Sequence, residues 1–184
     1  GGFPPLLVQL LVNRGVTRPE DFASFLASDA TLLLDPLLLP GMDRAIIRIN
    51  QALLKGETIG IYGDFDADGI TATAALVQGL AFLGGRTVPY IPHRQTEGHG
   101  LTASALKKLH EQGVSLVITV DCGVTDVVEA KTAREIGLDL IVTDHHTPLD
   151  EIPEAVAIIN PKLKGSAYPF PHLAGAGVAF KLLQ

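Results

Sequence analysis

The sequence predicts an α/β fold: a mainly parallel, five-stranded sheet with helices on both faces, preceded by a small helical N-terminal region. Two observations support this prediction. From Glu57 onward, short runs rich in β-branched residues alternate with segments of helical periodicity that are about ten residues or longer. The strand-like runs are apolar almost throughout, which is typical of parallel strands that are buried on both faces.

Residues 1–56 are expected to be helical. A capping box at Thr17–Glu20, with a proline inside the first turn, predicts a short helix that runs to about Leu26. The Leu- and Pro-rich stretch Asp29–Gly41 predicts an irregular segment. Met42–Lys55 places its apolar side chains on one helical face and is followed by a glycine, which predicts a second helix. We therefore expect residues 1–56 to form an extension that packs on the core of the following domain.

Residues 57–184 are expected to form that domain. Its predicted strands are Thr58–Tyr62, Thr87–Ile91, Leu116–Val120, Leu138–Val142 and Val156–Ile159. Its predicted helices are Ile70–Leu83, Ala103–Gln112, Asp126–Ile136 and Gly177–Leu183. Glycines follow the first three of these helices, where they are typical of helix ends.

The composition is that of an ordinary globular chain. Its 184 residues, of which 47% are hydrophobic and 18% charged, are enough to bury a core. No apolar run is long enough to suggest a membrane span, so no membrane partner is expected. The single cysteine, Cys122, excludes an internal disulfide and favours a reducing, cytoplasmic location.

The net charge of −6 argues at first against a nucleic-acid partner. Five of the acidic residues, however, belong to the cluster described next, and without them the chain would be close to neutral. No run of Lys and Arg forms a basic stripe, and aromatic residues are not interleaved with basic ones. If DNA or RNA binds, much of the electrostatic attraction must come from metal ions or from residues outside this sequence.

Acidic residues follow three of the predicted strands at the point where each strand ends. In open α/β sheets, the functional crevice lies beyond the carboxyl ends of the strands, so these groups are expected to meet in one site. The groups are Asp64, Asp66 and Asp68 after the first strand, Asp121 after the third, and Asp144-His145-His146 after the fourth.

Carboxylates this close together repel one another and raise one another's pKa unless a cation neutralises them. Carboxylates combined with imidazole, without a thiolate, favour Mn²⁺ or Mg²⁺ over structural zinc. Two such ions can activate a water molecule and stabilise the charge on a phosphoryl group. His146 is then available to hold a phosphate oxygen or to protonate the leaving group. The expected metal ligands are Asp64, Asp66, Asp68, Asp121 and His145.

Each part of this pattern has another interpretation. Asp64–Asp68 can be a loop that caps a helix, Asp121 can cap the next helix, and His145-His146 can be a structural pair. The stretch Asp66–Thr71 also suggests the phosphoaspartyl phosphatases, in which Asp66 would be the nucleophile. A non-catalytic metal-binding module would keep the same acids to stabilise its fold. The coincidence of all three groups at strand ends favours a single metal site.

The same residues carry a resemblance to a known family. Gly63–Thr71, Val120–Gly123 and the triplet Asp144–His146 resemble the DHH phosphoesterase superfamily. Within it, Ile91–Arg94 and the glycine-rich stretch Gly175–Leu182 resemble the single-stranded-DNA-specific exonucleases. The similarity covers nearly the whole chain. It implies a DHH-type fold and a two-metal hydrolase that degrades single-stranded DNA from 5′ to 3′ in repair and recombination, with a single-strand-binding protein and a helicase as partners.

The resemblance also implies roles for the site residues. Asp66, Asp68, Asp121 and His145 match metal ligands, with Asp121 as the bridge between the ions, and Asp64 matches a ligand or a neighbour of one. Asp144 matches a residue that orients the paired imidazoles, and His146 one on the phosphate side. The expected catalytic residues are therefore Asp144, His145 and His146.

Two further segments are implied to contact phosphate. His93 and Arg94 match a loop near the site. The amides of Gly175 to Gly177 open the last helix, where free N–H groups bind a phosphate or a partner loop.

The chain departs from the family pattern in several places. The family carries a further metal-ligating Asp and a second domain, both downstream of Gln184. We therefore expect residues 57–184 to be a DHH domain truncated at its C-terminal end, inactive or weakly active by itself. Tyr62 occupies a place where relatives carry a His ligand, and His99 a place where a Tyr is expected.

Other DHH members act on short oligonucleotides, cyclic dinucleotides or pyrophosphate. They begin the first motif with a His and an Asn-Pro pair ahead of the acids, whereas this chain has Tyr62–Phe65. That difference favours the single-stranded-DNA exonucleases. The polarity of cleavage and the choice of DNA over RNA rest on the resemblance alone, and the sequence leaves the oligomeric state open.

Overall fold

The computed structural model describes residues 2–27 and 33–184, which group into two compact units, Gly1–Asp35 and Pro36–Gln184. The first unit contains helices α1 (Pro5–Asn13) and α2 (Pro19–Leu26). Phe3, which precedes α1, makes an edge-to-face contact with Phe22 of α2, and their ring centroids lie 5.7 Å apart.

The expected capping box at the start of α2 is wrong. The N-cap residue is Arg18, and no side chain caps the helix. The helix begins one residue later than the motif requires, at Pro19, and Arg18 instead pairs with Asp21 at 2.7 Å. The irregular segment expected at 29–41 falls partly on residues 28–32, outside the described residues, and its later part forms the short 3-10 turn η2 (Pro36–Leu38).

The second unit is built on a parallel five-stranded sheet with the strand order β2-β1-β3-β4-β5. The strands are β1 (Thr58–Gly63), β2 (Arg86–Tyr90), β3 (Val114–Val120), β4 (Asp139–Thr143) and β5 (Ala157–Ile159). The prediction of the fold class is therefore confirmed, and each strand begins and ends within two residues of its predicted position. The strands could be predicted from the sequence because each is a nearly continuous apolar run.

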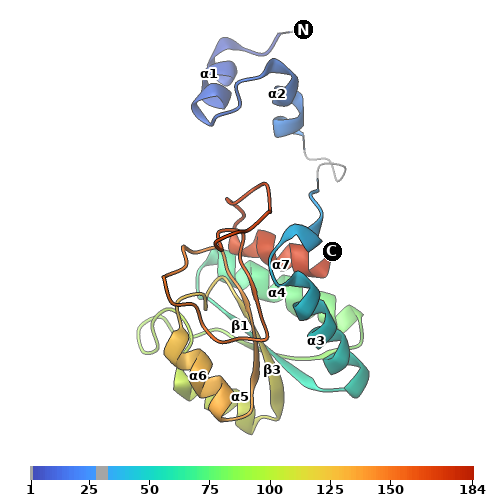
Figure 1. Cartoon of the computed structure of the whole chain (residues 1–184), viewed down its shortest axis with the longest axis vertical. Helices are drawn as coiled ribbons and strands as arrows, with labels where there is room; N and C mark the ends of the chain where they lie inside the picture. Colours follow the sequence, from blue (N-terminus) through green and yellow to red (C-terminus); the bar gives the residue numbers. More distant parts are fainter. Residues whose placement is uncertain (1, 28–32) are drawn as a thin grey trace. The chain divides into compact units, whose positions relative to one another are not determined.

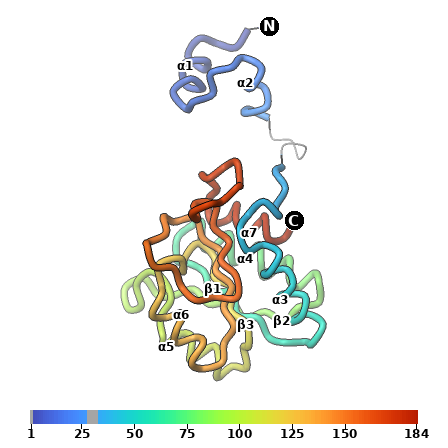
Figure 2. The backbone as a smooth tube through the Cα atoms, in the orientation of Figure 1, coloured from blue at the N-terminus to red at the C-terminus, as the bar shows by residue number. Residues whose placement is uncertain are grey.

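Helices cover both faces of this sheet. Helix α4 (Ala67–Phe82) packs against α7 (Gly175–Leu183) on one face, and α5 (Ala103–Glu111) packs against α6 (Val127–Glu135) on the other (Figures 1 and 2). Between the sheet and the α5–α6 layer lies a continuous apolar core, which includes Tyr62, Leu106, Val117, Leu140 and Val142. Two helices begin earlier than predicted: α4 at Ala67 and α7 at Gly175.

Helix α3 (Met42–Lys55) belongs to the second unit. It buries Met42, Ala45, Ile49 and Ala52 and packs against β5. Its N-cap, Gly41, has φ +74°, and a Cβ there would lie 2.8 Å from the Ile158 carbonyl oxygen. The compact units thus divide at Asp35, earlier than the division expected after residue 56, because the apolar face of α3 is part of the second unit's core.

The winding direction of the chain reverses between β1 and β3. From β1 the chain crosses by α4 to β2, on one side of β1, and then by α5 to β3, on the other side. Crossovers between parallel strands are right-handed, so these two helices must lie on opposite faces. The loops after β1 and β3 therefore diverge and leave a crevice at their carboxyl ends, which is where ligands bind in such sheets.

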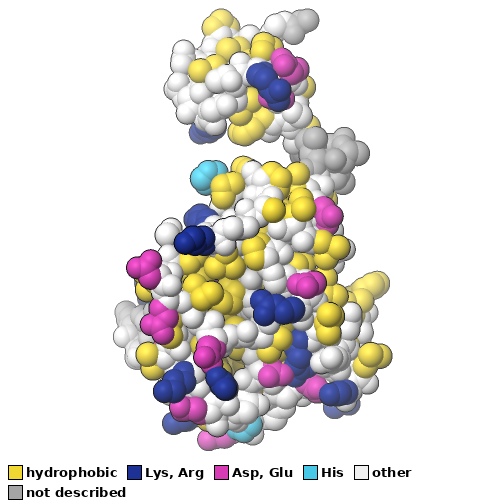
Figure 3. All heavy atoms as spheres, viewed as in Figure 1, with side chains coloured by type: hydrophobic (Ala, Val, Ile, Leu, Met, Phe, Trp, Pro, Cys, Tyr) yellow, Lys and Arg dark blue, Asp and Glu magenta, His cyan; other side chains and the backbone are white. Residues whose placement is uncertain are grey.

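The face of the second unit drawn in Figure 3 shows Lys and Arg side chains mixed with Asp and Glu, not gathered into a basic stripe. This agrees with the sequence pattern. Among the described residues, no helix is long and apolar enough to cross a membrane.

Gly69, in the first turn of α4, allows a test of how closely α4 packs against the loop after β1. A Cβ at Gly69 would lie 2.4 Å from the Asp64 carbonyl oxygen, so Gly69→Ala should lower the free energy of unfolding by about 3 kcal/mol. Gly56→Ala is the control, because Gly56 has φ +65° and open space around it, and should cost about 1 kcal/mol. Urea denaturation measures both. Equal losses in the two variants would contradict the close approach of α4 to the β1 loop.

Candidate metal centre

The loop after β1 holds its first two acids in different ways. Asp64 is buried, and its Oδ1 accepts a hydrogen bond from the Phe65 amide at 2.8 Å. Asp66 is the N-cap of α4 and accepts from the amides of Asp68 at 2.8 Å and Gly69 at 3.0 Å. The Gly69 amide is the main cause that lowers the pKa of Asp66. The helix-capping interpretation thus holds for Asp66, and its second oxygen takes no part in the cap.

Asp68 turns away from Asp66 and reaches the start of α7. Its two oxygens accept hydrogen bonds from the Gly175 amide at 2.7 Å and from the Ala176 amide at 2.6 Å. These amides form the positive end of the helix, so they stabilise the carboxylate. The Gly175 amide is therefore occupied by Asp68 in this structure and is not the free phosphate-binding group expected from the sequence. Gly177 lies in the same first turn of α7, and its phosphate role stays a prediction.

Asp121 follows β3 and is almost fully buried, with 2% of its surface exposed. Its backbone has φ +63°, a left-handed conformation that Asp tolerates better than most residues. The α7 helix approaches so closely that a Cβ at Gly175 would lie 2.6 Å from the Asp121 side chain. Glycine at 175 is therefore what allows α7 to approach this side chain.

The environment of Asp121 disfavours its charge. Burial, followed by the repulsion from Asp68 and Asp66, raises the pKa of Asp121 to about 7. His145 Nε2 lies 3.0 Å from Asp121 Oδ1, which is close enough for an ion pair, yet this oxygen is buried and receives no hydrogen bond of acceptable geometry. The oxygen is therefore short of a partner, and a cation would supply one.

The loop after β4 is organised by Asp144. Its Oδ1 accepts from the amides of His145 at 2.7 Å and His146 at 3.1 Å, and from His146 Nδ1 at 2.8 Å. Its Oδ2 accepts from the Val124 amide at 3.0 Å. Because Asp144 is satisfied by donors, it fixes the orientation of His146 and leaves Nε2 as that ring's free nitrogen. Burial lowers the pKa of His146, but the attraction of Asp144 outweighs it and the net pKa is raised.

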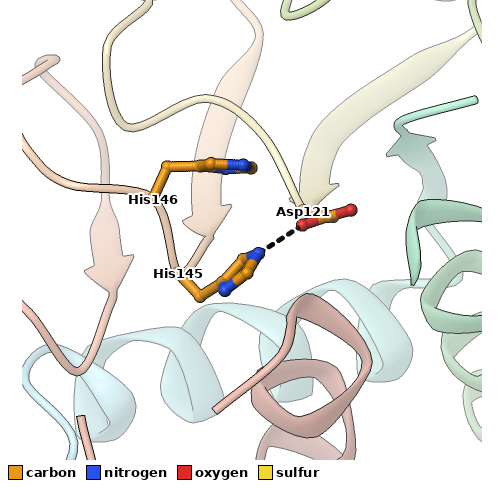
Figure 4. A group of neighbouring side chains, drawn as sticks. All are labelled: Asp121, His145 and His146. Atoms are coloured by element: carbon orange, nitrogen blue, oxygen red, sulfur yellow. Dashed lines mark ion pairs between the residues drawn. The ribbon is translucent and has the colours of Figure 1, made fainter. Parts of the chain in front are cut away.

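Two groups of side chains that follow β1, β3 and β4 have the arrangement of a metal site. In each group, one ligand atom per residue lies within 4.8 Å of the others: Asp64, Asp66 and Asp121 in the first, and Asp121, His145 and His146 in the second. Asp121 is common to both. Figure 4 shows the second group, in which His145 points from the loop after β4 toward Asp121 at the end of β3. A hollow of about 380 Å³ is lined by Asp64, Asp66, Asp121 and His146 of these groups, and by Asp144, Asp126 and His99.

These donors fit a divalent cation. They are carboxylate oxygens and imidazole nitrogens, which suit Mn²⁺ or Mg²⁺. Asp121, whose Oδ1 receives no hydrogen bond, is the residue that the two groups share. Asp68, expected as a ligand, belongs to neither group, although its Oδ2 lies 3.7 Å from His145 Nε2. Its two oxygens accept backbone hydrogen bonds from α7, and its role as a metal ligand stays a prediction.

The loop after β2 lies beside the first group. The guanidinium of Arg94 stands 5.2 Å from the centre of the Phe65 ring. The backbone amide of His93 donates to Glu97 at 2.8 Å, and the His93 side chain contacts Thr96. The expected phosphate contacts of His93 and Arg94 stay predictions.

The sequence interpretation noted His99 as a departure but gave it no role. Its ring packs on Phe65 with centroids 4.3 Å apart, and its Nδ1 lies 3.2 Å from Asp64 Oδ2. The glycines on either side of His99 were the only local signal in the sequence, and both have positive φ in the structure.

A second hollow of about 400 Å³ lies beside α6 and the start of β4. It is of similar size, and two of the residues that line it, Arg134 and Glu154, form an ion pair. It lies at the opposite end of the strands from the acids and imidazoles. Because it contains neither metal group, we do not regard it as the functional site.

Comparison with known proteins identifies the family of this chain. The family model described as DHH family, N-terminal domain, matches residues 58–184. The chain therefore belongs to the DHH family.

Its relatives include single-stranded-DNA-specific exonucleases named RecJ. The Bacillus subtilis RecJ is 47% identical over 178 residues, which are 97% of this chain and 23% of the relative. The Thermus thermophilus RecJ is 42% identical over 171 residues, which are 93% of this chain and 24% of the relative. The chain thus spans about a quarter of the length of these curated relatives.

The chain is also similar to solved structures of RecJ. A crystal structure of exonuclease RecJ bound to manganese matches with a TM-score of 0.74 at 42% identity, over 82% of this chain and 38% of that one. The crystal structure of the Thermus thermophilus RecJ in complex with Mn²⁺ matches with a TM-score of 0.71 at 36% identity, over 96% of this chain and 24% of that one.

The buried charge of Asp121 predicts a dependence of stability on pH in the absence of metal. Its pKa rises from 3.8 to about 7 on folding, so the folded chain keeps a proton that the unfolded chain has lost. The contribution of Asp121 to stability therefore falls as the pH rises from about 4 to about 7, at up to about 1.4 kcal/mol per pH unit. Asp121→Asn cannot ionise and should escape this loss.

Urea denaturation with a chelator at pH 4.5 and pH 8 measures the effect. The stability of Asp121→Asn relative to the wild type should increase by about 3 kcal/mol between the two pH values. Asp43→Asn, an exposed carboxylate in the first turn of α3, is the control and should show no such change. If the difference in stability between Asp121→Asn and the wild type does not grow with pH, folding does not raise the pKa of Asp121.

Proposed function

We propose that this chain supplies the metal-binding part of a phosphodiesterase that hydrolyses single-stranded DNA from its 5′ end. The observation that carries the proposal is Asp121, a buried carboxylate that belongs to both potential ligand groups and has one oxygen without a hydrogen bond. A carboxylate shared by two ligand groups could serve two neighbouring cations. Asp64 and Asp66 would complete one position and His145 the other, with His146 on the phosphate side.

The chain's own residues would have separate tasks. Bound Mn²⁺ or Mg²⁺ supplies an activated water molecule and positive charge for the phosphoryl oxygens. Asp144 holds the His146 ring through Nδ1, so His146 Nε2 is the nitrogen able to contact a phosphate oxygen or move a proton. Asp68 holds the start of α7 against the hollow.

The substrate is inferred from the relatives. RecJ proteins similar to this chain are named single-stranded-DNA-specific exonucleases, and two RecJ structures carry manganese. The 5′→3′ polarity, a role in repair and recombination, and a single-strand-binding protein and a helicase as partners are proposed on the resemblance. The free, buried Cys122 is compatible with the reducing cytoplasm that we propose as the location.

We also propose a division of labour within the longer relatives. The net charge is negative, and on the face that Figure 3 draws the Lys and Arg side chains are mixed with Asp and Glu and form no basic groove. The electrostatic attraction for DNA phosphates would therefore come from the metal ions and from regions of such proteins outside the part that this chain matches. Residues 57–184 alone would then bind metal but turn over substrate slowly.

Metal binding is the direct test. Calorimetric titration of the chain with Mn²⁺ at pH 8 should show one or two ions, and Asp121→Asn should weaken binding at least a hundredfold because it removes the shared charged ligand. Binding should also weaken as the pH falls below about 7, where Asp121 takes up a proton. Glu111→Gln, at the far end of α5, is the control. Unchanged binding by Asp121→Asn would refute the shared ligand.

Substrate choice tests the rest of the proposal. A full-length protein that contains this chain should degrade single-stranded DNA with Mn²⁺ at least tenfold faster than duplex DNA, dinucleotides or pyrophosphate. Asp144→Asn should slow it about tenfold or more, because His146 loses its orientation. End-labelled strands report the polarity. A preference for dinucleotides or pyrophosphate would assign the chain to another branch of the DHH family.

A further inference from the structure

The segment Glu97–Leu101 is held firmly at its start. The Glu97 carboxylate accepts hydrogen bonds from the hydroxyl of Tyr90, at the end of β2, and from the amide of His93 at 2.8 Å. The His93 amide is the main cause that lowers the pKa of Glu97. One carboxylate thus closes the turn that leads into the segment.

The segment is also held at its end. The hydroxyl of Tyr62, which is fully buried in β1, donates to the Gly100 carbonyl oxygen at 2.9 Å. The Leu101 amide donates to Asp126 Oδ2 at 2.7 Å. Gly100 has φ +79°, and a Cβ there would lie 2.7 Å from the same oxygen of Asp126. The backbone on both sides of residue 99 is therefore fixed by contacts to the sheet and to the N-cap of α6.

His99 lies between these anchors and extends over the metal hollow. Its Nδ1 is 3.2 Å from Asp64 Oδ2, and its ring packs on Phe65, which also contacts Arg94. His99 lines the same hollow as Asp64, Asp66 and Asp121. Asp64 is 8% exposed at its side chain and His99 71%, so the imidazole covers the carboxylate from the solvent side.

We propose that His99 is a positioning residue of the metal centre, which donates its Nδ1–H to Asp64 and fixes the orientation of that carboxylate. The inference rests on the proposed function. Asp64 has two oxygens, and the Phe65 amide holds Oδ1. Without His99, no described hydrogen bond restrains Oδ2, and the carboxylate gains freedom to turn about the Oδ1 contact. Donors that orient a ligand typically contribute about tenfold or more to metal affinity.

The contact also defines a tautomer. Both oxygens of an ionised Asp64 are acceptors, so a hydrogen bond requires the hydrogen on His99 Nδ1. Nε2 is then the free nitrogen on the exposed side of the hollow. This assignment can be checked without any metal and without activity.

The first experiment is a long-range ¹H–¹⁵N NMR spectrum of the metal-free chain at pH 8, with His99→Phe used to assign the signals. The Nδ1–H tautomer is the result expected for His99. The Nε2–H tautomer would overturn the inference, since the nitrogen that faces Asp64 would then carry no hydrogen.

The second experiment measures Mn²⁺ affinity by calorimetry for two substitutions that separate stacking from donation. His99→Phe keeps a ring on Phe65 but loses the donor, and should bind about tenfold more weakly. His99→Asn loses the ring but keeps an N–H donor near the Nδ1 position, and should recover most of the affinity. His110→Phe, the same change at an exposed histidine in α5, is the matched control and should bind as the wild type does.

A double-mutant cycle completes the test. In an Asp64→Asn background, His99→Phe should have no further effect, because His99 acts through the Asp64 carboxylate. If the wild type binds Mn²⁺ and His99→Phe binds equally well, the role of His99 is refuted while the metal centre stands. If the wild type binds no Mn²⁺, the proposed metal centre is refuted and the inference with it.

Discussion

The structure depends on how it accommodates several carboxylates in one small hollow. Asp66 accepts amides at the start of α4, Asp68 accepts amides at the start of α7, and Asp144 accepts amides from its own loop and from Val124. Backbone donors thus stabilise three charges. Asp121 is the exception: it is buried, it faces the other acids, and one of its oxygens has no hydrogen bond. The three other acids receive backbone hydrogen bonds and this oxygen of Asp121 receives none. A cation at that point would compensate the charge of Asp121.

Much of this arrangement could be predicted from the sequence, because it follows from local rules. Apolar runs revealed the strands, and the acids come directly after them, so their meeting at one edge of a parallel sheet was predictable. The partner of Asp68 was not predictable, because the Gly175 amide lies 107 residues away and the contact depends on how α4 packs against α7. The role of His99 was hidden for the same reason: Asp64 is 35 residues distant.

The strand order explains why Asp64 and Asp121 matter more than the other strand-end residues. They follow β1 and β3, the two strands between which the winding direction reverses. On either side of this point the connections lie over the strand ends, but here they diverge and leave the carboxyl ends open. Asp144 follows β4, one strand further along, and reaches the crevice through the loop that carries His145 and His146. The centre is therefore assembled from neighbouring strands that are separated in the sequence by whole helices.

Helix α7 links this centre to the rest of the fold. Its first amides hold Asp68, its Gly175 lies against Asp121, and Leu183 near its other end fills the space above Gly79 of α4. The same helix is therefore fixed by apolar packing at one end and by charge at the other. A cation bound at Asp121 would reduce the repulsion between Asp121 and Asp68, and Asp68 is the residue that holds α7. Occupancy of the metal centre and the seating of α7 are thus expected to stabilise each other, because both relieve the same excess of negative charge.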